Sequence, residues 1–132
     1  MNITLALANP LSGGEIQLPA SKSISNRVLL LHQYLQNPPP IINLSKAEDT
    51  KVLQKALAAS HDVVDVGHAG TAMRFLTAFY AAQQGKKVLL KGSERMHQRP
   101  IKILVDALKQ LGASVNYLEE AVYPPLKITG KL

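Results

Sequence analysis

Several polar side chains are concentrated at residues 21–27, where an incoming strand is expected to give way to a helix. The free N–H groups and the positive dipole end of a helix start make such a junction suitable for an anion. Lys22 and Arg27 flank the Ser23 hydroxyl, a combination that suits a phosphate or a carboxylate. The segment can also be a plain helix start, capped by Ser21 or Ser23, with two solvated cations. Cations oppose the dipole at this end of a helix, which counts against that alternative.

A second junction, GHAGTAMR at 67–74, contains two glycines that permit tight backbone turns. A run of exposed N–H groups there would face an anion. The segment is neither GxGxxG nor a P-loop, so both nucleotide-binding motifs are absent from it. Alternatively, it is an ordinary glycine-containing turn with Thr71 as the helix N-cap.

A third junction, within residues 92–108, carries Arg95 and Arg99 just before a helix that Pro100 helps to start. Taken alone, it could be a basic surface loop. Together with the other two junctions, it predicts one pocket for an anion that has more than one charged group.

The remaining polar residues give little support to other chemistry. The chain has no cysteine, and His32, His61, His68 and His97 are not spaced like metal ligands, so no metal is expected. His68, inside the glycine turn, is a candidate ligand contact. No Ser-His-Asp arrangement can be argued from the sequence.

Composition and charge indicate which kinds of partner the protein can bind. The chain has 132 residues, 46% of them hydrophobic, and a net charge of +6, as expected for one globular domain with an anionic partner. Binding of nucleic acid is disfavoured by the absence of Trp, the scarcity of aromatic residues and the lack of a dense basic run. Neither a signal peptide nor a membrane span is recognisable, so we expect a cytoplasmic protein without a membrane partner.

The elements that position these residues follow from hydrophobic periodicity and turn signals. Strands are predicted at 3–8, 15–19, 41–44, 62–66, 86–92, 114–120 and 125–129. Helices are predicted at 21–35, 48–59, 71–83 and 99–112, the last of them ending at Gly112. The order from 62 to 129 is one complete βαβαββ unit. The expected fold is α+β, built from βαβαββ units, with mixed sheets and helices packed on one face.

Four segments together carry a family resemblance. They are LP-x-SKS-x-SNR-x-LLL (18–31), AGTAMR (69–74), ER-M-x-x-RPI-x-x-LVDAL-x-x-LGA (94–113) and YPPL-x-I (123–128). The chain resembles bacterial 5-enolpyruvylshikimate-3-phosphate (EPSP) synthases, also called 3-phosphoshikimate 1-carboxyvinyltransferases. The resemblance implies transfer of enolpyruvyl from phosphoenolpyruvate to the 5-hydroxyl of shikimate 3-phosphate, with release of phosphate, on the pathway to chorismate and the aromatic amino acids. It also implies a two-domain enzyme, usually monomeric, with no cofactor or metal.

The resemblance also implies roles for individual residues. Lys22 is expected to be catalytic and to contact both substrates. Ser23 and Arg27 would hold shikimate 3-phosphate, while the Gly70 backbone and Arg99 would hold phosphoenolpyruvate. The sequence departs from the family pattern at three positions, which are Ala20, His68 and Phe75.

The resemblance implies a partial chain as well. Residues 1–19 would belong to the opposite domain, and residues 20–132 to part of the shikimate-3-phosphate-binding domain. The acidic residue that handles the proton of the 5-hydroxyl would lie beyond Leu132. We therefore expect this piece alone to be inactive and to self-associate through exposed apolar surface. A non-catalytic module for small phosphorylated anions and a small RNA-binding domain stay open as alternatives.

Overall fold

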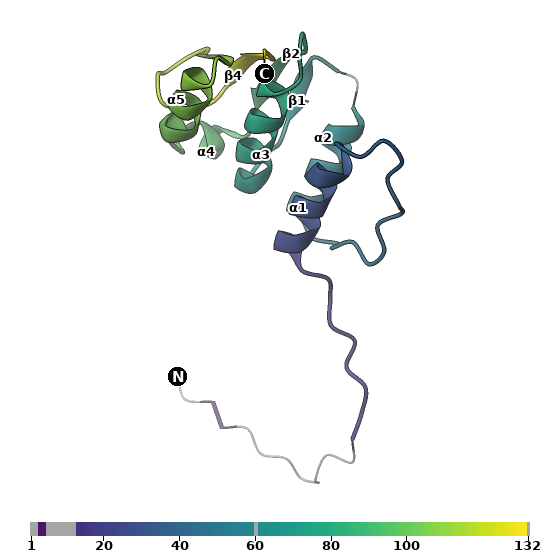
Figure 1. Ribbon diagram of the computed structural model, residues 1–132. Helices are drawn as coiled ribbons and strands as arrows, with labels where there is room; N and C mark the ends of the chain where they lie inside the picture. The colour runs from purple at the N-terminus through teal and green to yellow at the C-terminus, as the bar shows by residue number, and fades with distance from the viewer. Residues whose placement is uncertain (1–2, 5–12, 60, 132) are drawn as a thin grey trace.

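A four-stranded mixed sheet forms one layer of the molecule (Figure 1). The computed structural model describes residues 3–4, 13–59 and 61–131. The strands are β1 (Val63–Asp65), β2 (Lys87–Lys91), β3 (Ser114–Tyr117) and β4 (Leu126–Thr129), in the spatial order β1-β2-β4-β3. β1 and β2 are parallel, whereas β4 pairs antiparallel with both β2 and β3.

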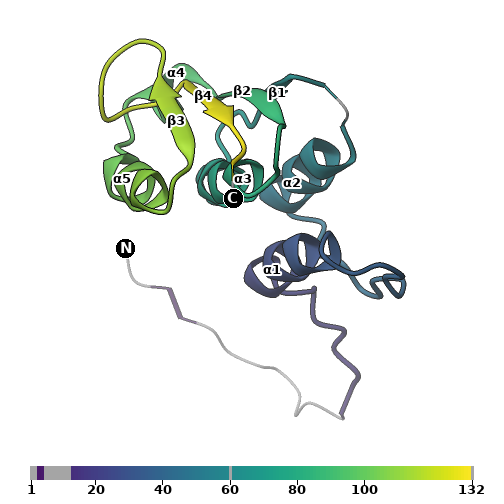
Figure 2. The same cartoon turned by 45° about the horizontal axis from the view of Figure 1, so that its top comes forward.

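Helices cover one face of this sheet. α3 (Gly70–Ala81) connects β1 to β2, and α5 (Lys102–Gln110) lies between β2 and β3 in the chain. Figure 2 shows α5, α3 and α2 (Glu48–Ala58) in a row on the same side of the sheet. The βαβαββ unit and the α+β fold with helices on one face are therefore confirmed. The crossover also contains a four-residue helix, α4 (Glu94–His97), which the sequence did not predict because so short an element shows no periodicity.

The core lies between the sheet and these helices. Strands alternate between buried and exposed side chains, as a sheet with one covered face requires. The largest fully buried side chains come from both layers and include Leu53, Met73, Leu76, Leu90, Val105, Leu126 and Ile128. This core fixes the start of α3 relative to the loop after β2, where the predicted site residues lie.

The first helix, α1 (Lys22–His32), packs on α2 and touches α3. Of the two predicted N-cap candidates, Ser21 takes the position, and its hydroxyl accepts a hydrogen bond from the Ile24 N–H at 3.4 Å. The helix ends three residues before the predicted Leu35. The Ser25 hydroxyl accepts from the buried Ser45 N–H at 3.0 Å and ties α1 to the segment that leads into α2.

Two predicted strands are not formed. Residues 41–44 have no regular structure, since the Ile42 side chain is 87% exposed and Asn43 has a φ of 58°. Residues 15–19 are also without strand pairing, because the described part of the chain offers them no neighbouring strand. Most of the predicted strand at 3–8 lies outside the described residues. None of the described helices has the length and apolar character needed to cross a bilayer.

The other helix boundaries are close to those predicted, with small shifts. Pro100 precedes α5 instead of lying in its first turn, and Gly112 follows the C-cap residue Leu111 with a φ of 98°. Thr71 is not the N-cap of α3, because that position is taken by Ala69 and Thr71 lies inside the first turn.

Candidate anion-binding site

At the start of α1, Arg27 folds back over the first turn. Its Nη1 donates to the Ser23 carbonyl oxygen at 3.0 Å and also to the Ser23 hydroxyl. The first turn of α1 contains no acidic residue that would neutralise this cation. Arg27 also lies over the Phe75 ring of α3, with Cζ 6.0 Å from the ring centroid. These contacts place a hydroxyl and a guanidinium together, as the sequence predicted.

Lys22 is positioned by a carboxylate that the sequence analysis did not single out. Its Nζ lies 3.3 Å from Oδ2 of Asp49, in the first turn of α2. The side chains are 50% and 28% exposed, respectively, so this ion pair contributes little to stability. It orients Lys22 and can be displaced by a stronger anion.

The start of α3 comes within contact distance of Arg99. The N-cap of α3 makes no side-chain hydrogen bond, so the first N–H groups of this 12-residue helix lack a side-chain acceptor. A Cβ added at the buried Gly70 would lie 2.5 Å from Nη1 of Arg99. Only glycine allows the guanidinium to lie this close to the helix start.

Arg74, one turn further along α3, holds the segment that carries Arg99. Its Nη2 donates to the Pro100 carbonyl oxygen at 3.0 Å. Arg74 was not among the residues predicted for the site. The available signal was its position four residues after Gly70, which places both residues on one face of a helix.

These groups surround one cavity of about 450 Å³. Its walls are Lys22, Ser23, Asn26, Arg27, Gly70, Thr71, Arg74, Phe75 and Arg99. All five predicted site residues (Lys22, Ser23, Arg27, Gly70 and Arg99) are thus brought together. Among the described residues, the lining includes four cations, two hydroxyls and a glycine at a helix start, but no carboxylate. This arrangement can bind and neutralise anions, but it provides no acid or base of its own with an ordinary pKa near neutrality.

Asn26 adds an unsatisfied polar group to the cavity wall. It is 1% exposed, and neither its amide nitrogen nor its amide oxygen has a hydrogen-bond partner among the described residues. Buried polar groups are nearly always paired, so a lone amide here is expected of a site that receives water or a polar ligand.

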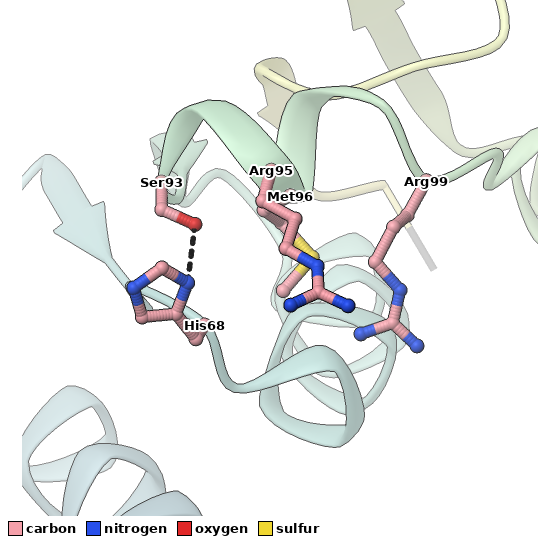
Figure 3. Close-up of a pocket in the computed structure, with 5 residues that line it drawn as sticks. All are labelled: His68, Ser93, Arg95, Met96 and Arg99. Atoms are coloured by element: carbon pink, nitrogen blue, oxygen red, sulfur yellow. Dashed lines mark hydrogen bonds between the residues drawn. The ribbon is translucent and has the colours of Figure 1, made fainter.

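A second hollow of about 380 Å³ adjoins the cavity and shares Arg99 with it. It is lined by His68, Ser93, Arg95, Met96 and Arg99 (Figure 3). His68, the candidate ligand contact, uses Nδ1 in a 2.8 Å hydrogen bond with the Ser93 hydroxyl. Within the described residues, no group of three or more His, Asp or Glu side chains is placed to hold a metal ion.

Comparison with known proteins identifies the family. The family model described as EPSP synthase (3-phosphoshikimate 1-carboxyvinyltransferase) matches residues 52–132, more than half of the chain. The chain belongs to the EPSP synthase family. The matched region contains the larger part of α2 and the whole βαβαββ unit, together with two of the three helix starts that form the cavity.

Individual relatives agree with this assignment. The chain is 50% identical over 116 residues to the 3-phosphoshikimate 1-carboxyvinyltransferase of Bacteroides fragilis strain YCH46, covering 88% of this chain and 28% of the relative. It is 43% identical over 143 residues to that of Bordetella pertussis strain Tohama I, covering 91% and 32%. The structure of the EPSP synthase from Acinetobacter baumannii superposes with a TM-score of 0.81 at 21% identity, covering 89% and 32%. The chain spans about a third of the length of these proteins.

Proposed function

We propose that this chain supplies part of the substrate site of an enzyme that transfers enolpyruvyl from phosphoenolpyruvate to the 5-hydroxyl of shikimate 3-phosphate. The products are 5-enolpyruvylshikimate 3-phosphate and phosphate. The observation that carries the proposal is the convergence of Lys22, Arg27 and Arg99 on one cavity in a chain of the EPSP synthase family. Both substrates carry a phosphate and a carboxylate, which matches a cavity lined with several cations and no acid.

The proposed roles divide the cavity into two sides. Ser23 and Arg27, at the start of α1, hold shikimate 3-phosphate. The Gly70 backbone, at the start of α3, and Arg99 hold phosphoenolpyruvate. Lys22 contacts both substrates and is the proposed catalytic residue, because it neutralises charge where the two meet. The volume of about 450 Å³ is within the range of small-molecule sites.

The proposed reaction begins with protonation of the vinyl carbon of phosphoenolpyruvate and addition of the 5-hydroxyl. Phosphate is then eliminated from the tetrahedral adduct. The described residues serve this sequence by positioning and charge neutralisation, which account for a large share of many enzymatic rate enhancements. No metal or organic cofactor is needed. No carboxylate of the described residues lines the cavity, and we propose that the group that takes the hydroxyl proton lies outside its walls.

Membership of the EPSP synthase family also supports proposals for domain organisation, location and oligomeric state. Residues 20–132 are proposed to be part of the shikimate-3-phosphate-binding domain, and residues 1–19 to belong to the opposite domain. We propose a cytoplasmic enzyme that is monomeric at full length and has no nucleic-acid partner. The isolated 132-residue chain exposes large apolar side chains such as Ile24, Leu31 and Tyr34, which favours self-association.

The test is phosphate release by the full product of the reading frame that encodes this chain. Release should require both phosphoenolpyruvate and shikimate 3-phosphate. It should fall by about 100-fold or more in Lys22→Ala and Arg99→Ala, since each removes a charge-assisted contact. Lys127→Ala, on the exposed face of β4, is the control and should retain activity.

The same experiment distinguishes a second function, a non-catalytic module for phosphorylated anions. That module would use the same cations that line the cavity, without the chemical step. A folded product that binds both compounds but releases no phosphate would establish the module and refute the transferase. For the isolated 132 residues, we expect binding without turnover, and normal turnover would contradict this.

A further inference from the structure

Two guanidinium groups line the second hollow. Arg95, on α4, and Arg99, just after it, project in the same direction above the first turn of α3 (Figure 3). Among the described residues, neither guanidinium makes an ion pair or a side-chain hydrogen bond. Two like charges held together without a counter-charge are unfavourable. An anion between them would remove this repulsion.

The backbone that carries Arg95 is fixed against the turn before α3. The Ser93 N–H donates to the Gly67 carbonyl oxygen at 3.0 Å, while the Ser93 hydroxyl bonds His68. A Cβ added at Gly92 would lie 2.7 Å from the same carbonyl oxygen and 2.8 Å from Cγ of Met96, so the two loops are in close contact. The buried Met96 side chain anchors α4 in the core. Arg95 is therefore attached to a rigid part of the molecule and not to a free surface loop.

We propose that Arg95 is a second guanidinium of the anion site, and that Arg95 and Arg99 together bind one phosphoryl group. Two planar guanidinium groups provide several parallel N–H donors, which suit the oxygens of a phosphate dianion better than the single charge of a carboxylate. The inference rests on the proposed function, in which Arg99 receives phosphoenolpyruvate. The bound phosphoryl group belongs either to that substrate or to the phosphate that is released.

The test compares Arg95→Gln with Lys127→Gln, which removes the same charge from the exposed face of β4. Both are made in the full product of the reading frame. Arg95→Gln should raise the KM for phosphoenolpyruvate and the Kd for inorganic phosphate by about 10- to 100-fold, as expected for loss of a charge-assisted contact. The KM for shikimate 3-phosphate should change less than about threefold, and Arg95→Lys should restore part of the loss. Lys127→Gln should leave all three constants within about twofold, as expected for a distant exposed charge.

The outcomes separate this proposal from the transferase assignment. If Arg95→Gln melts like the wild type and keeps both the KM for phosphoenolpyruvate and the Kd for phosphate, the phosphoryl role of Arg95 is wrong. Equal losses for both substrates would also overturn it, because they indicate a general disturbance of the cavity. If the wild type binds inorganic phosphate through Arg95 but never releases phosphate from the two substrates, this proposal stands and the transferase assignment falls. If the wild type releases phosphate from the two substrates but binds no inorganic phosphate, and Arg95→Gln keeps its KM for phosphoenolpyruvate, this proposal fails and the transferase assignment stands.

Discussion

Replacement of Gly70 by Ala tests how closely Arg99 is held against the start of α3. The added Cβ would lie 2.5 Å from Nη1 of Arg99, 3.1 Å from Cζ and 3.3 Å from Nη2. Non-bonded heavy atoms are most favourable at about 3.5–4.0 Å, so the guanidinium must move by roughly 1 Å. The displaced atoms are the end of an exposed, flexible side chain. We therefore expect the fold to keep its stability, with a melting temperature within about 2–3 °C of the wild type.

Binding should respond much more than stability. A misplacement of about 1 Å at a reacting centre can cost about 100-fold, and Arg99 is the proposed contact to the phosphoryl group. Steady-state measurement of phosphate release should show the KM for phosphoenolpyruvate raised by about 10- to 100-fold. The KM for shikimate 3-phosphate should change less than about threefold, because Ser23 and Arg27 bind on the other side of the cavity.

Lys127→Ala, on the exposed face of β4, is the control, and it should change neither the kinetics nor the stability. An unaltered KM for phosphoenolpyruvate in a well-folded Gly70→Ala protein would refute the assignment of Arg99 to that substrate. A large loss of melting temperature would instead contradict the inference that only a flexible side chain has to move.

Three further substitutions test other contacts. Phe75→Leu removes the ring beneath Arg27 and should weaken shikimate 3-phosphate binding by about two- to fivefold in a titration, the equivalent of about 0.5–1 kcal/mol. Tyr80→Phe removes a buried hydrogen bond to the Ala56 carbonyl oxygen and should lower the free energy of unfolding by about 0.5–1.5 kcal/mol in urea. Tyr117→Phe should be neutral or stabilising, because the buried Tyr117 hydroxyl has no partner among the described residues. Burial raises the pKa of Tyr80 above its ordinary value of 10.0, so the unfolded state loses this proton at a lower pH than the folded state. The free energy of unfolding should therefore fall as the pH rises through 10. This fall should be smaller in Tyr80→Phe, which has no hydroxyl to titrate.

The sequence was a good guide to the βαβαββ unit because its signals are local. A short apolar run defined β2, alternating apolar residues defined β4, and periodic apolar residues defined α3 and α5. The failed strand at 41–44 is also apolar, but a strand exists only where another strand accepts its hydrogen bonds. Ile42 has no such neighbour and is exposed. Apolarity alone could not reveal this, and the same reason applies to residues 15–19.

The positions of Gly70 and Arg99 in the site follow from the order of the strands in the sheet. β1 and β2 are parallel neighbours, so the segments after them emerge at the same edge of the sheet. The hydrogen bonds from Val66 N–H to Lys91 C=O (2.9 Å) and from Ser93 N–H to Gly67 C=O (3.0 Å) join these two segments directly. Gly70 begins the helix that follows one of them, and Arg99 ends the other. Their proximity was therefore predictable once the strand order was known.

The rest of the site depends on helix packing, which the sequence did not specify. α1 does not connect two strands of the described sheet. The pairing of the strands therefore does not determine where Lys22, Ser23 and Arg27 lie. They reach the cavity because α1 packs on α2 and α3, with the Ser25–Ser45 bond, the Lys22–Asp49 pair and the Arg27–Phe75 contact between these elements. The proposed shikimate 3-phosphate side is thus joined to the proposed phosphoenolpyruvate side by helix contacts alone. A substitution that loosens α1 should therefore weaken binding of shikimate 3-phosphate more than binding of inorganic phosphate, which depends on Arg95 and Arg99.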